Sequence, residues 1–254
     1  MEIVGYAKKW GNGSGVLLPR EWEGSEVKVI LIDRTLQIKK EVFSMLGDCL
    51  EDIAGIYLAG SHSRGEQESG SDIDIIAVSG KTKKEIVSGR YRISIYPLES
   101  VRKSLAGNPM LIYPRLAEAK PILNAALLAE LKNAGITKKS FRPFITDTKR
   151  IIRINKKLIE MAGPESKISD PPVVYSLLLR LRGIFIIKSL LGKKAGYSNR
   201  AFREWLGREL GENIGDAYQV YRDVRENRKP GIKIRAELAR KLLALLEKEV
   251  KKYG

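Results

Sequence analysis

Two short polar motifs, each placed at the end of an apolar run, dominate the first half of this 254-residue chain. The apolar run 56–59 predicts a short buried strand that ends at Gly60-Ser61, and ten residues later Asp72-Ile73-Asp74 opens a second strand. Because strand residues two apart point to the same face, the carboxylates of Asp72 and Asp74 are expected to lie parallel. The pattern predicts a sheet with a polar site where its strands end.

The longer strings around these motifs carry a resemblance to a known family. Residues 58–66 read LAGSHSRGE and residues 71–76 read SDIDII. Together they resemble the nucleotidyltransferase superfamily that includes DNA polymerase beta, and above all its minimal members, some of which are antitoxins that adenylylate a partner. Either motif alone is common, whereas both at this spacing are specific. The resemblance implies Mg²⁺-dependent transfer of a nucleoside monophosphate from an NTP, with ATP expected, to an acceptor hydroxyl.

The chemistry of such a reaction accounts for the residue types. Two neighbouring carboxylates, here Asp72 and Asp74, stay ionised cheaply only with a cation between them, and hard oxygen ligands suit Mg²⁺. Gly60 would let the backbone approach a triphosphate, and the Ser61 hydroxyl could hydrogen-bond its β- and γ-phosphates. Arg64 could place positive charge against the leaving pyrophosphate. We therefore expect Asp72 and Asp74 to be catalytic and metal-binding, and Gly60, Ser61 and Arg64 to bind the nucleotide.

The next strand departs from what the resemblance implies. Active family members usually supply a third carboxylate there, and the alternation along residues 91–97 puts Ser94 at that position. Serine is a poor metal ligand and no strong general base near neutral pH. Glu99 lies past the end of the strand and is a distant substitute. The departure places turnover itself in question.

Three functions therefore remain open. The first is the nucleotidyltransferase reaction described above. The second is a catalytically inactive nucleotidyltransferase-fold protein that binds nucleic acid or a partner protein as a dimeric regulator. The third, a partner-binding protein of a toxin–antitoxin pair, would reveal itself by a second protein that co-purifies.

The scarcity of cysteine and histidine excludes several other chemistries. Cys49 is the only cysteine, so the chain has no intramolecular disulfide and no cysteine-clustered zinc or iron–sulfur site. His62 is the only histidine, which excludes multi-histidine metal sites. It lies in the turn after Gly60-Ser61, where it either contacts a phosphate or base or is an ordinary turn residue.

The first forty residues read as a β-rich segment. Strands are expected over 3–10, 16–18 and 27–32, with a fourth over 35–38. The run KWGNGSGVLLP, residues 9–19, resembles the SpoVT/AbrB-like swapped-hairpin domains, in particular small archaeal transposon-associated relatives. That resemblance implies an interleaved, often DNA-binding dimer. A lone hairpin cannot bury both of its faces, so it either pairs with a second copy as a homodimer or packs against its own chain.

The last part of the chain reads as helices throughout and carries most of the charge. Residues 136–254 have 28 basic and 13 acidic side chains, a net charge of +15 within a total of +16. Such a basic module favours a polyanionic partner such as nucleic acid, although a solvated helical surface is the alternative. We expect an α+β chain with a β segment over 1–40, a nucleotidyltransferase domain with a mixed sheet over 41–140, and a helical bundle over 141–254.

One apolar helix pattern, residues 173–191, is interrupted by Arg180, Arg182 and Lys188. Either arginine could reach nucleotide phosphates, or it could form a buried ion pair or extend to solvent. These charges also exclude a membrane span, and no targeting segment is visible, which predicts a cytoplasmic protein. Few glutamines with abundant Lys, Glu and Ile hint at a thermophile.

Overall fold

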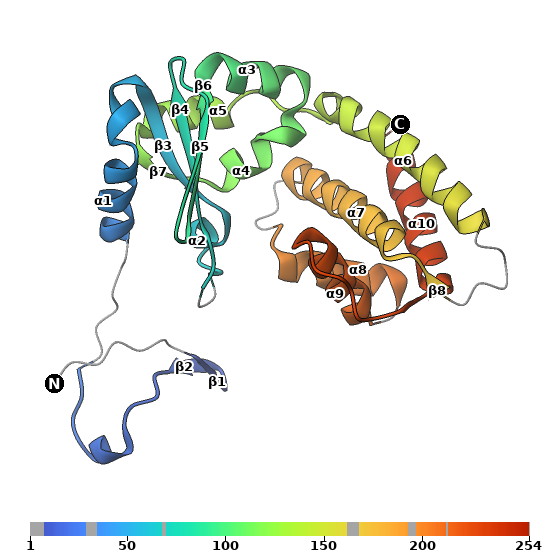
Figure 1. Ribbon diagram of the computed structural model, residues 1–254, viewed down its shortest axis with the longest axis horizontal. Coiled ribbons are helices and arrows are strands. Elements are labelled where there is room, and N and C mark those ends of the chain that lie inside the picture. The colour runs from blue at the N-terminus through green and yellow to red at the C-terminus, as the bar shows by residue number, and fades with distance from the viewer. Residues whose placement is uncertain are drawn as a thin grey trace. The chain divides into compact units, whose positions relative to one another are not determined.

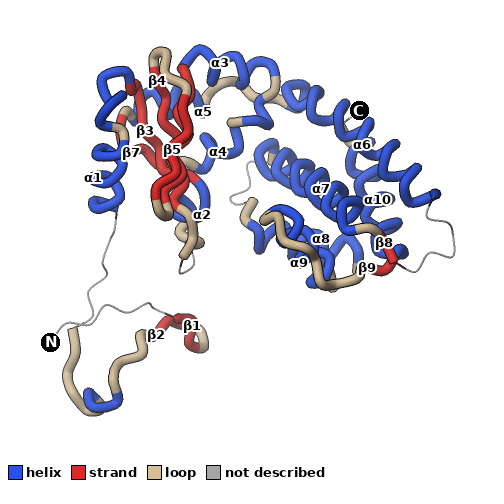
Figure 2. The backbone as a smooth tube through the Cα atoms, in the orientation of Figure 1, coloured by secondary structure: helices blue, strands red, loops and turns tan. Residues whose placement is uncertain are grey.

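The computed structural model describes residues 8–28, 35–67, 70–161, 168–192, 197–211 and 213–253. The chain forms two compact units, residues 1–42 and 43–254. It has the expected α+β architecture, with an N-terminal hairpin, a mixed sheet and C-terminal helices (Figure 1; Figure 2). In the described parts of the chain, no helix is both long and apolar enough to cross a membrane.

The N-terminal unit holds a small antiparallel hairpin of β1 (Lys8–Trp10) and β2 (Gly13–Gly15), followed by the 3₁₀ turn η1 (Arg20–Trp22). Residues 16–18 continue as loop, so the second strand lies earlier than expected. The expected strand over 27–32 falls largely outside the described residues. The fourth was wrong, because residues 35–38 begin a helix, α1 (Thr35–Met45).

The central sheet has five strands in the order β5-β6-β4-β3-β7. They are β3 (Ile53–Ala59), β4 (Ile73–Ser79), β5 (Lys84–Ser88), β6 (Tyr91–Pro97) and β7 (Lys120–Leu123). Only β4 and β6 run parallel, and the other neighbours are antiparallel. The two central strands β3 and β4 are almost wholly buried and rich in β-branched residues, as a sheet interior requires.

Short helices cover one face of this sheet. They are α3 (Leu98–Gly107), the 3₁₀ turn η3 (Pro109–Leu111), α4 (Tyr113–Glu118) and α5 (Ala125–Lys132). Their side chains share a hydrophobic core with Tyr57, Ile76 and Val78 of β3 and β4. Since alternate residues of a strand share a face, Asp74 lies on the same face as Ile76 and Val78, at the end of the strand. The core thus fixes the direction in which Asp74 points.

The C-terminal part is a bundle of five helices in the described residues, with a larger core of its own. They are α6 (Arg142–Met161), α7 (Pro171–Leu191), α8 (Asn199–Leu210), α9 (Gly215–Arg225) and α10 (Ala236–Lys251). The 3₁₀ turn η4 (Lys138–Phe141) precedes α6, and β8 (Ile168–Ser169) pairs with β9 (Ile234–Arg235). The Ser198 side chain accepts the Ala201 amide N–H and so caps the start of α8.

Candidate functional site

Gly60 stands where β3 ends and the five-residue helix α2 (Gly60–Arg64) begins. Its φ is +69°, a conformation that L side chains rarely adopt. A Cβ built on Gly60 would lie 2.3 Å from Oδ2 of Asp74, so a side chain at position 60 would displace this carboxylate. The cause is the antiparallel register, which pairs Ala59 with Asp74. The structure therefore brings the two sequence motifs into direct contact.

The two carboxylates occupy the start of β4. Asp74 is half-buried, and no described residue forms a hydrogen bond or ion pair with its carboxylate. Asp72 precedes the strand and is more exposed, and its Oδ2 accepts a hydrogen bond from Nε of Arg92 at 2.8 Å. Asp74 thus has free oxygen ligands, whereas Asp72 already has a cationic partner.

The parallel register of β4 and β6 decides which residue lies beside the carboxylates. Asp74 is paired with Arg92, and Ser94 is paired with Ile76, one step deeper on the same face. No third carboxylate joins Asp72 and Asp74. The described residues contain no group of three or more acidic, histidine or cysteine side chains that could hold a metal ion. Arg92 was missed because the sequence pattern does not give the register between strands.

Arg92 and Asp72 form an exposed ion pair. The hydrogen bond from Arg92 and the charge of Asp72 together raise the pKa of Arg92. Both side chains are about half exposed, at 52% and 48%. Pairs with this exposure contribute little to stability, so Asp72 can readily exchange Arg92 for another ligand.

Glu118, at the end of α4, is a site residue that the sequence analysis missed. Its Oε1 accepts the Gly60 amide N–H at 3.1 Å, and its Oε2 lies 2.6 Å from Nη1 of Arg64. Nε of Arg64 also donates to Glu66 at 2.8 Å. Two nucleotide-binding candidates, Gly60 and Arg64, therefore bind the carboxylate of Glu118. No local pattern could reveal a partner 58 residues away.

The ionisation of this pair follows from burial and charge. Burial raises the pKa of Glu118, and the guanidinium of Arg64 and the Gly60 amide oppose that rise. Burial works against the charge on Arg64, but Glu66 and Glu118 outweigh it and raise the pKa of Arg64. The short contact between Arg64 and Glu118 is that of an ionised pair.

Ser61 and His62 lie half-buried on α2, next to Gly60. Burial lowers the pKa of His62, and a hydrogen bond to the Ser71 backbone opposes the shift. Its Nε2 is buried and has no hydrogen-bond partner among the described residues. Ser63, not Ser61, bonds within the helix, since its hydroxyl donates to the Gly60 carbonyl at 2.8 Å. The Ser61 hydroxyl is thus not used to close the turn.

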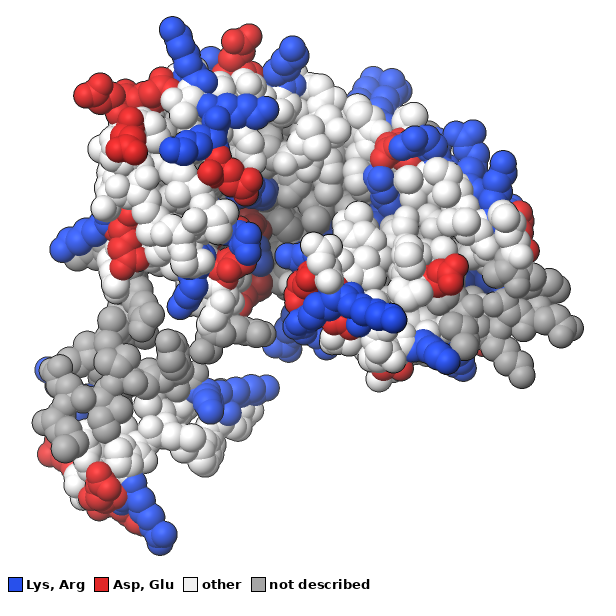
Figure 3. Space-filling view, viewed as in Figure 1, with Lys and Arg blue, Asp and Glu red and all other residues white. Residues whose placement is uncertain are grey.

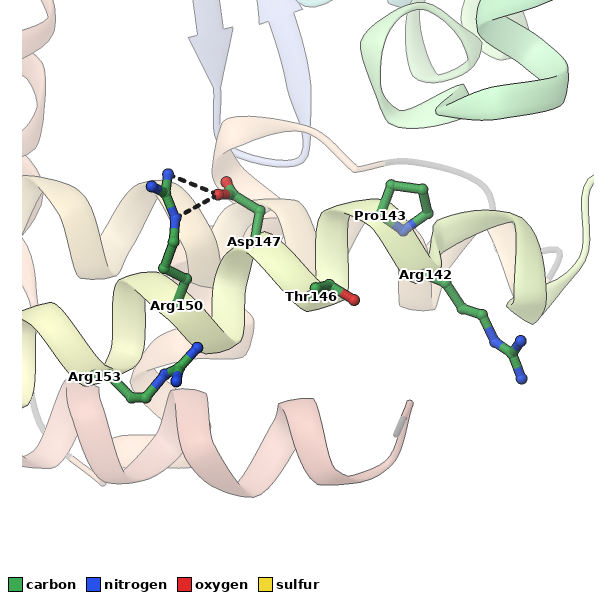
Figure 4. A pocket seen from close by; sticks show the side chains of 6 residues that line it. All are labelled: Arg142, Pro143, Thr146, Asp147, Arg150 and Arg153. Carbon is green, nitrogen blue, oxygen red and sulfur yellow. Dashed lines mark hydrogen bonds and ion pairs between the residues drawn. The ribbon is translucent and has the colours of Figure 1, made fainter.

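A shallow depression of about 540 Å³ lies elsewhere, along α6 (Figure 4). It is lined by Arg142, Pro143, Thr146, Asp147, Arg150 and Arg153. Arg150 points to Asp147 and bonds its carboxylate, while the Arg142 side chain extends away from that pair. Lys and Arg side chains are frequent over the helical part of the visible surface (Figure 3). This surface is basic and does not include the residues around Gly60.

Comparison with known proteins gives one extended match. A family model described as "Nucleotidyltransferase domain" matches residues 37–189, more than half of the chain. No curated protein sequence matches.

Two solved structures are similar in outline. A nucleotidyltransferase-like protein from Exiguobacterium sibiricum has 13% sequence identity and a TM-score of 0.37, over 85% of this chain and 74% of that one. A spectinomycin adenyltransferase from Enterococcus faecialis, solved with ATP and spectinomycin, has 14% identity and a TM-score of 0.40, over 86% and 98%.

Proposed function

Because the chain belongs to the nucleotidyltransferase domain family, we propose that it moves a nucleoside monophosphate from an NTP to an acceptor hydroxyl with the help of Mg²⁺. ATP is the first nucleotide to consider. The observation that carries the proposal is the contact between Gly60 and Asp74, which leaves a glycine backbone, and no side chain, directly beside a free carboxylate.

Asp72 and Asp74 fit one magnesium ion. Mg²⁺ is commonly bound by one or two carboxylates and completed by water and substrate phosphates, so two aspartates satisfy the protein's share. Asp74 has no partner among the described residues, and the exposed ion pair of Asp72 is weak. A bound Mg²⁺ would neutralise charge on the reacting phosphate and on the leaving group.

The residues on α2 provide for the triphosphate. The Gly60 amide and the Arg64 guanidinium bind a carboxylate from Glu118, which has the negative charge and the oxygen acceptors of a phosphate edge. We propose that the triphosphate replaces Glu118 on these two donors. The Ser61 hydroxyl, which does not close the helix turn, would then donate to a phosphate oxygen.

The first prediction tests the carboxylates. The protein is incubated with α-³²P-labelled NTPs, Mg²⁺, total RNA and soluble protein extract, and label transfer is followed on gels. The double variant Asp72→Ala/Asp74→Ala should lose about 100-fold or more of the transfer, because the metal contribution is several kcal/mol. The matched control Asp48→Ala/Asp170→Ala removes two exposed carboxylates elsewhere and should transfer label as the wild type does. Equal label transfer by both double variants would contradict the proposal.

A second function, a non-catalytic regulator that binds nucleic acid or a partner protein, is favoured by one observation. Arg92 already neutralises Asp72, and no third carboxylate lies with these two aspartates in the described residues. In that case the wild type would transfer no label to any acceptor. It would instead bind its partner equally well before and after the double aspartate substitution. The hairpin of β1 and β2 would then serve as the dimer contact, which sedimentation of the intact chain measures.

A further inference from the structure

Two arginines interrupt the apolar helix α7, and the structure separates their roles. Nη2 of Arg180 lies 2.6 Å from Oδ2 of Asp147, and its guanidinium lies over the Phe144 ring at 5.5 Å. Arg180 therefore has the structural ion pair that a charged residue on a buried helix needs. Arg182 has no carboxylate partner in the described part of the chain.

The guanidinium of Arg182 is largely enclosed, and one of its nitrogens is unsatisfied. Its Nη1 is fully buried and has no hydrogen-bond partner among the described residues. Its Cζ lies 5.6 Å from the centre of the Phe202 ring, which covers one face. Burial lowers the pKa of Arg182, and the like charges of Arg225 and Arg64 act in the same direction. A buried, unpaired cation is costly, and an anion in contact with it removes that cost.

Arg182 faces the part of the sheet domain that carries the candidate site. Its charge lowers the pKa of Glu118, the residue that holds Gly60 and Arg64. Contact between the two parts is direct, because the Tyr197 hydroxyl donates to the Pro114 carbonyl in the first turn of α4. The helical bundle therefore adds a positive charge on the side where Gly60 and Arg64 bind an oxyanion.

Aromatic side chains lie around Arg182. Tyr221 stacks on Tyr175 at 5.4 Å between ring centres and contacts Tyr218 at 5.6 Å. The charges that Tyr221 and Tyr218 carry when ionised raise the pKa of Arg182, so both phenol groups lie near its guanidinium. A fixed guanidinium beside phenol hydroxyls is a set of donors that suits an oxyanion.

We propose that Arg182, with Tyr218 and Tyr221, forms an anion site that binds a phosphate group of the substrates. The inference rests on the proposed function, since nucleotidyl transfer is what brings phosphates to Gly60 and Arg64. A planar guanidinium fork matches two oxygens of one phosphate, which a lysine cannot do. The phosphate belongs either to the triphosphate of the NTP or to a phosphorylated acceptor.

The test measures pyrophosphate binding by isothermal titration calorimetry, without metal and without turnover. The wild type should bind pyrophosphate, and Arg182→Gln should bind it about tenfold more weakly or worse, the effect of losing a hydrogen bond to a charged group. Arg180→Gln, the same change two residues away on the same helix, should bind as the wild type does. Arg182→Lys keeps the charge and loses the fork, so it should show a smaller loss, and it decides the matter if the Gln variant does not fold.

Two further arms identify the source of the phosphate. An equal loss of ATP affinity in Arg182→Gln assigns the site to the triphosphate. Unchanged ATP affinity, with pyrophosphate binding lost on the ATP-saturated protein, assigns it to the acceptor. Equal pyrophosphate affinity in the wild type and Arg182→Gln, or no binding by the wild type, overturns the inference. Asp72→Ala/Asp74→Ala should still bind pyrophosphate. Loss of label transfer therefore tests the proposed function, and loss of pyrophosphate binding tests the Arg182 site.

Discussion

Arg92 is the residue whose position changes the chemistry of the site most. It occupies the register position beside Asp74 and pairs with Asp72 at 2.8 Å, so one of the two candidate metal ligands carries a competing cation. A metal ion has to displace this guanidinium before it can use both carboxylates. Arg92 is thus expected to weaken metal binding in the absence of nucleotide.

The second prediction follows from that competition. Arg92→Ala should bind Mn²⁺, a spectroscopic substitute for Mg²⁺, up to about fivefold more tightly, which is the range of an exposed ion pair. Electron paramagnetic resonance of free Mn²⁺ measures the affinity directly. Arg102→Ala is the matched control, because Arg102 of α3 makes a similarly exposed ion pair with Glu130 of α5 at 2.7 Å. Unchanged or weaker Mn²⁺ binding in Arg92→Ala would show that the pair does not compete.

The sequence predicted part of the candidate site and missed another part for a physical reason. Gly60 and Asp74 were expected from motifs at strand ends, and the structure places them in contact. Arg92 and Glu118 were not expected, because their roles depend on strand register and on a contact across the fold. The roles of Ser61, Arg64, Asp72 and Asp74 in binding and catalysis stay predictions.

Among the elements, the strands with strong apolar patterns were predicted and the edge strand was not. The strands β3, β4 and β6 lie where the apolar runs indicated. The sequence of β5, Lys84–Ser88, has three polar residues in five, and it is largely exposed at the edge of the sheet. Residues 84–88 form a strand because they pair with β6, and their own sequence has no strand pattern. The helix α6 begins at Arg142 and has Pro143 in its first turn, where a proline is tolerated.

Asp52 secures the junction between the central strands. Its carboxylate accepts the amide N–H groups of Lys81 and Thr82, the latter at 2.7 Å. Gly80 lies so close that an added Cβ would be 2.5 Å from Oδ1 of Asp52. Hydrogen bonds from Thr82 and then Lys81 lower the pKa of Asp52 from 3.8 to about 2. The charged carboxylate therefore holds the loop after β4 to the start of β3.

The third prediction concerns the pH dependence of this junction. Since the pKa is lower in the folded state, the contribution of Asp52 to stability is complete above about pH 4 and is lost as the pH falls toward 2. Asp52→Ala should melt about 2–4 °C below the wild type at pH 7, and the gap should close between pH 4 and 2. Differential scanning calorimetry measures both. Asp48→Ala removes an exposed carboxylate on the 3₁₀ turn η2 (Gly47–Asp52), which also holds Asp52, and should show no such gap. A gap that persists at pH 2 would contradict the assignment.

Taken as one molecule, the chain separates its charge from its candidate active site. Residues 136–254 carry a net charge of +15, and residues 41–135 carry 11 basic and 12 acidic side chains. Along the 20-residue helix α6, exposed Arg142, Lys149, Arg153 and Lys156 follow one another at intervals of three or more residues. This surface is the part of the chain that we propose contacts nucleic acid.

The fourth prediction tests that surface by its salt dependence. If RNA or DNA binds there, the logarithm of the binding constant falls linearly with the logarithm of the salt concentration. Arg142→Ala/Arg153→Ala should reduce the slope by about 1.5, since each lost phosphate contact removes roughly 0.7–0.9. Lys81→Ala/Lys84→Ala, which removes two exposed charges from the sheet domain, should leave the slope unchanged. Fluorescence anisotropy with labelled oligonucleotides provides the measurement, and equal slopes in both double variants would exclude α6 as the contact.

The close approach of Gly60 and Asp74 also has an evolutionary consequence. With 2.3 Å between an added Cβ and the carboxylate oxygen, a side chain at position 60 can enter only after the aspartate at position 74 has shortened or turned away. The two positions therefore cannot drift independently. A substitution of Gly60 would therefore have to be accompanied by a change in the conformation or the identity of residue 74.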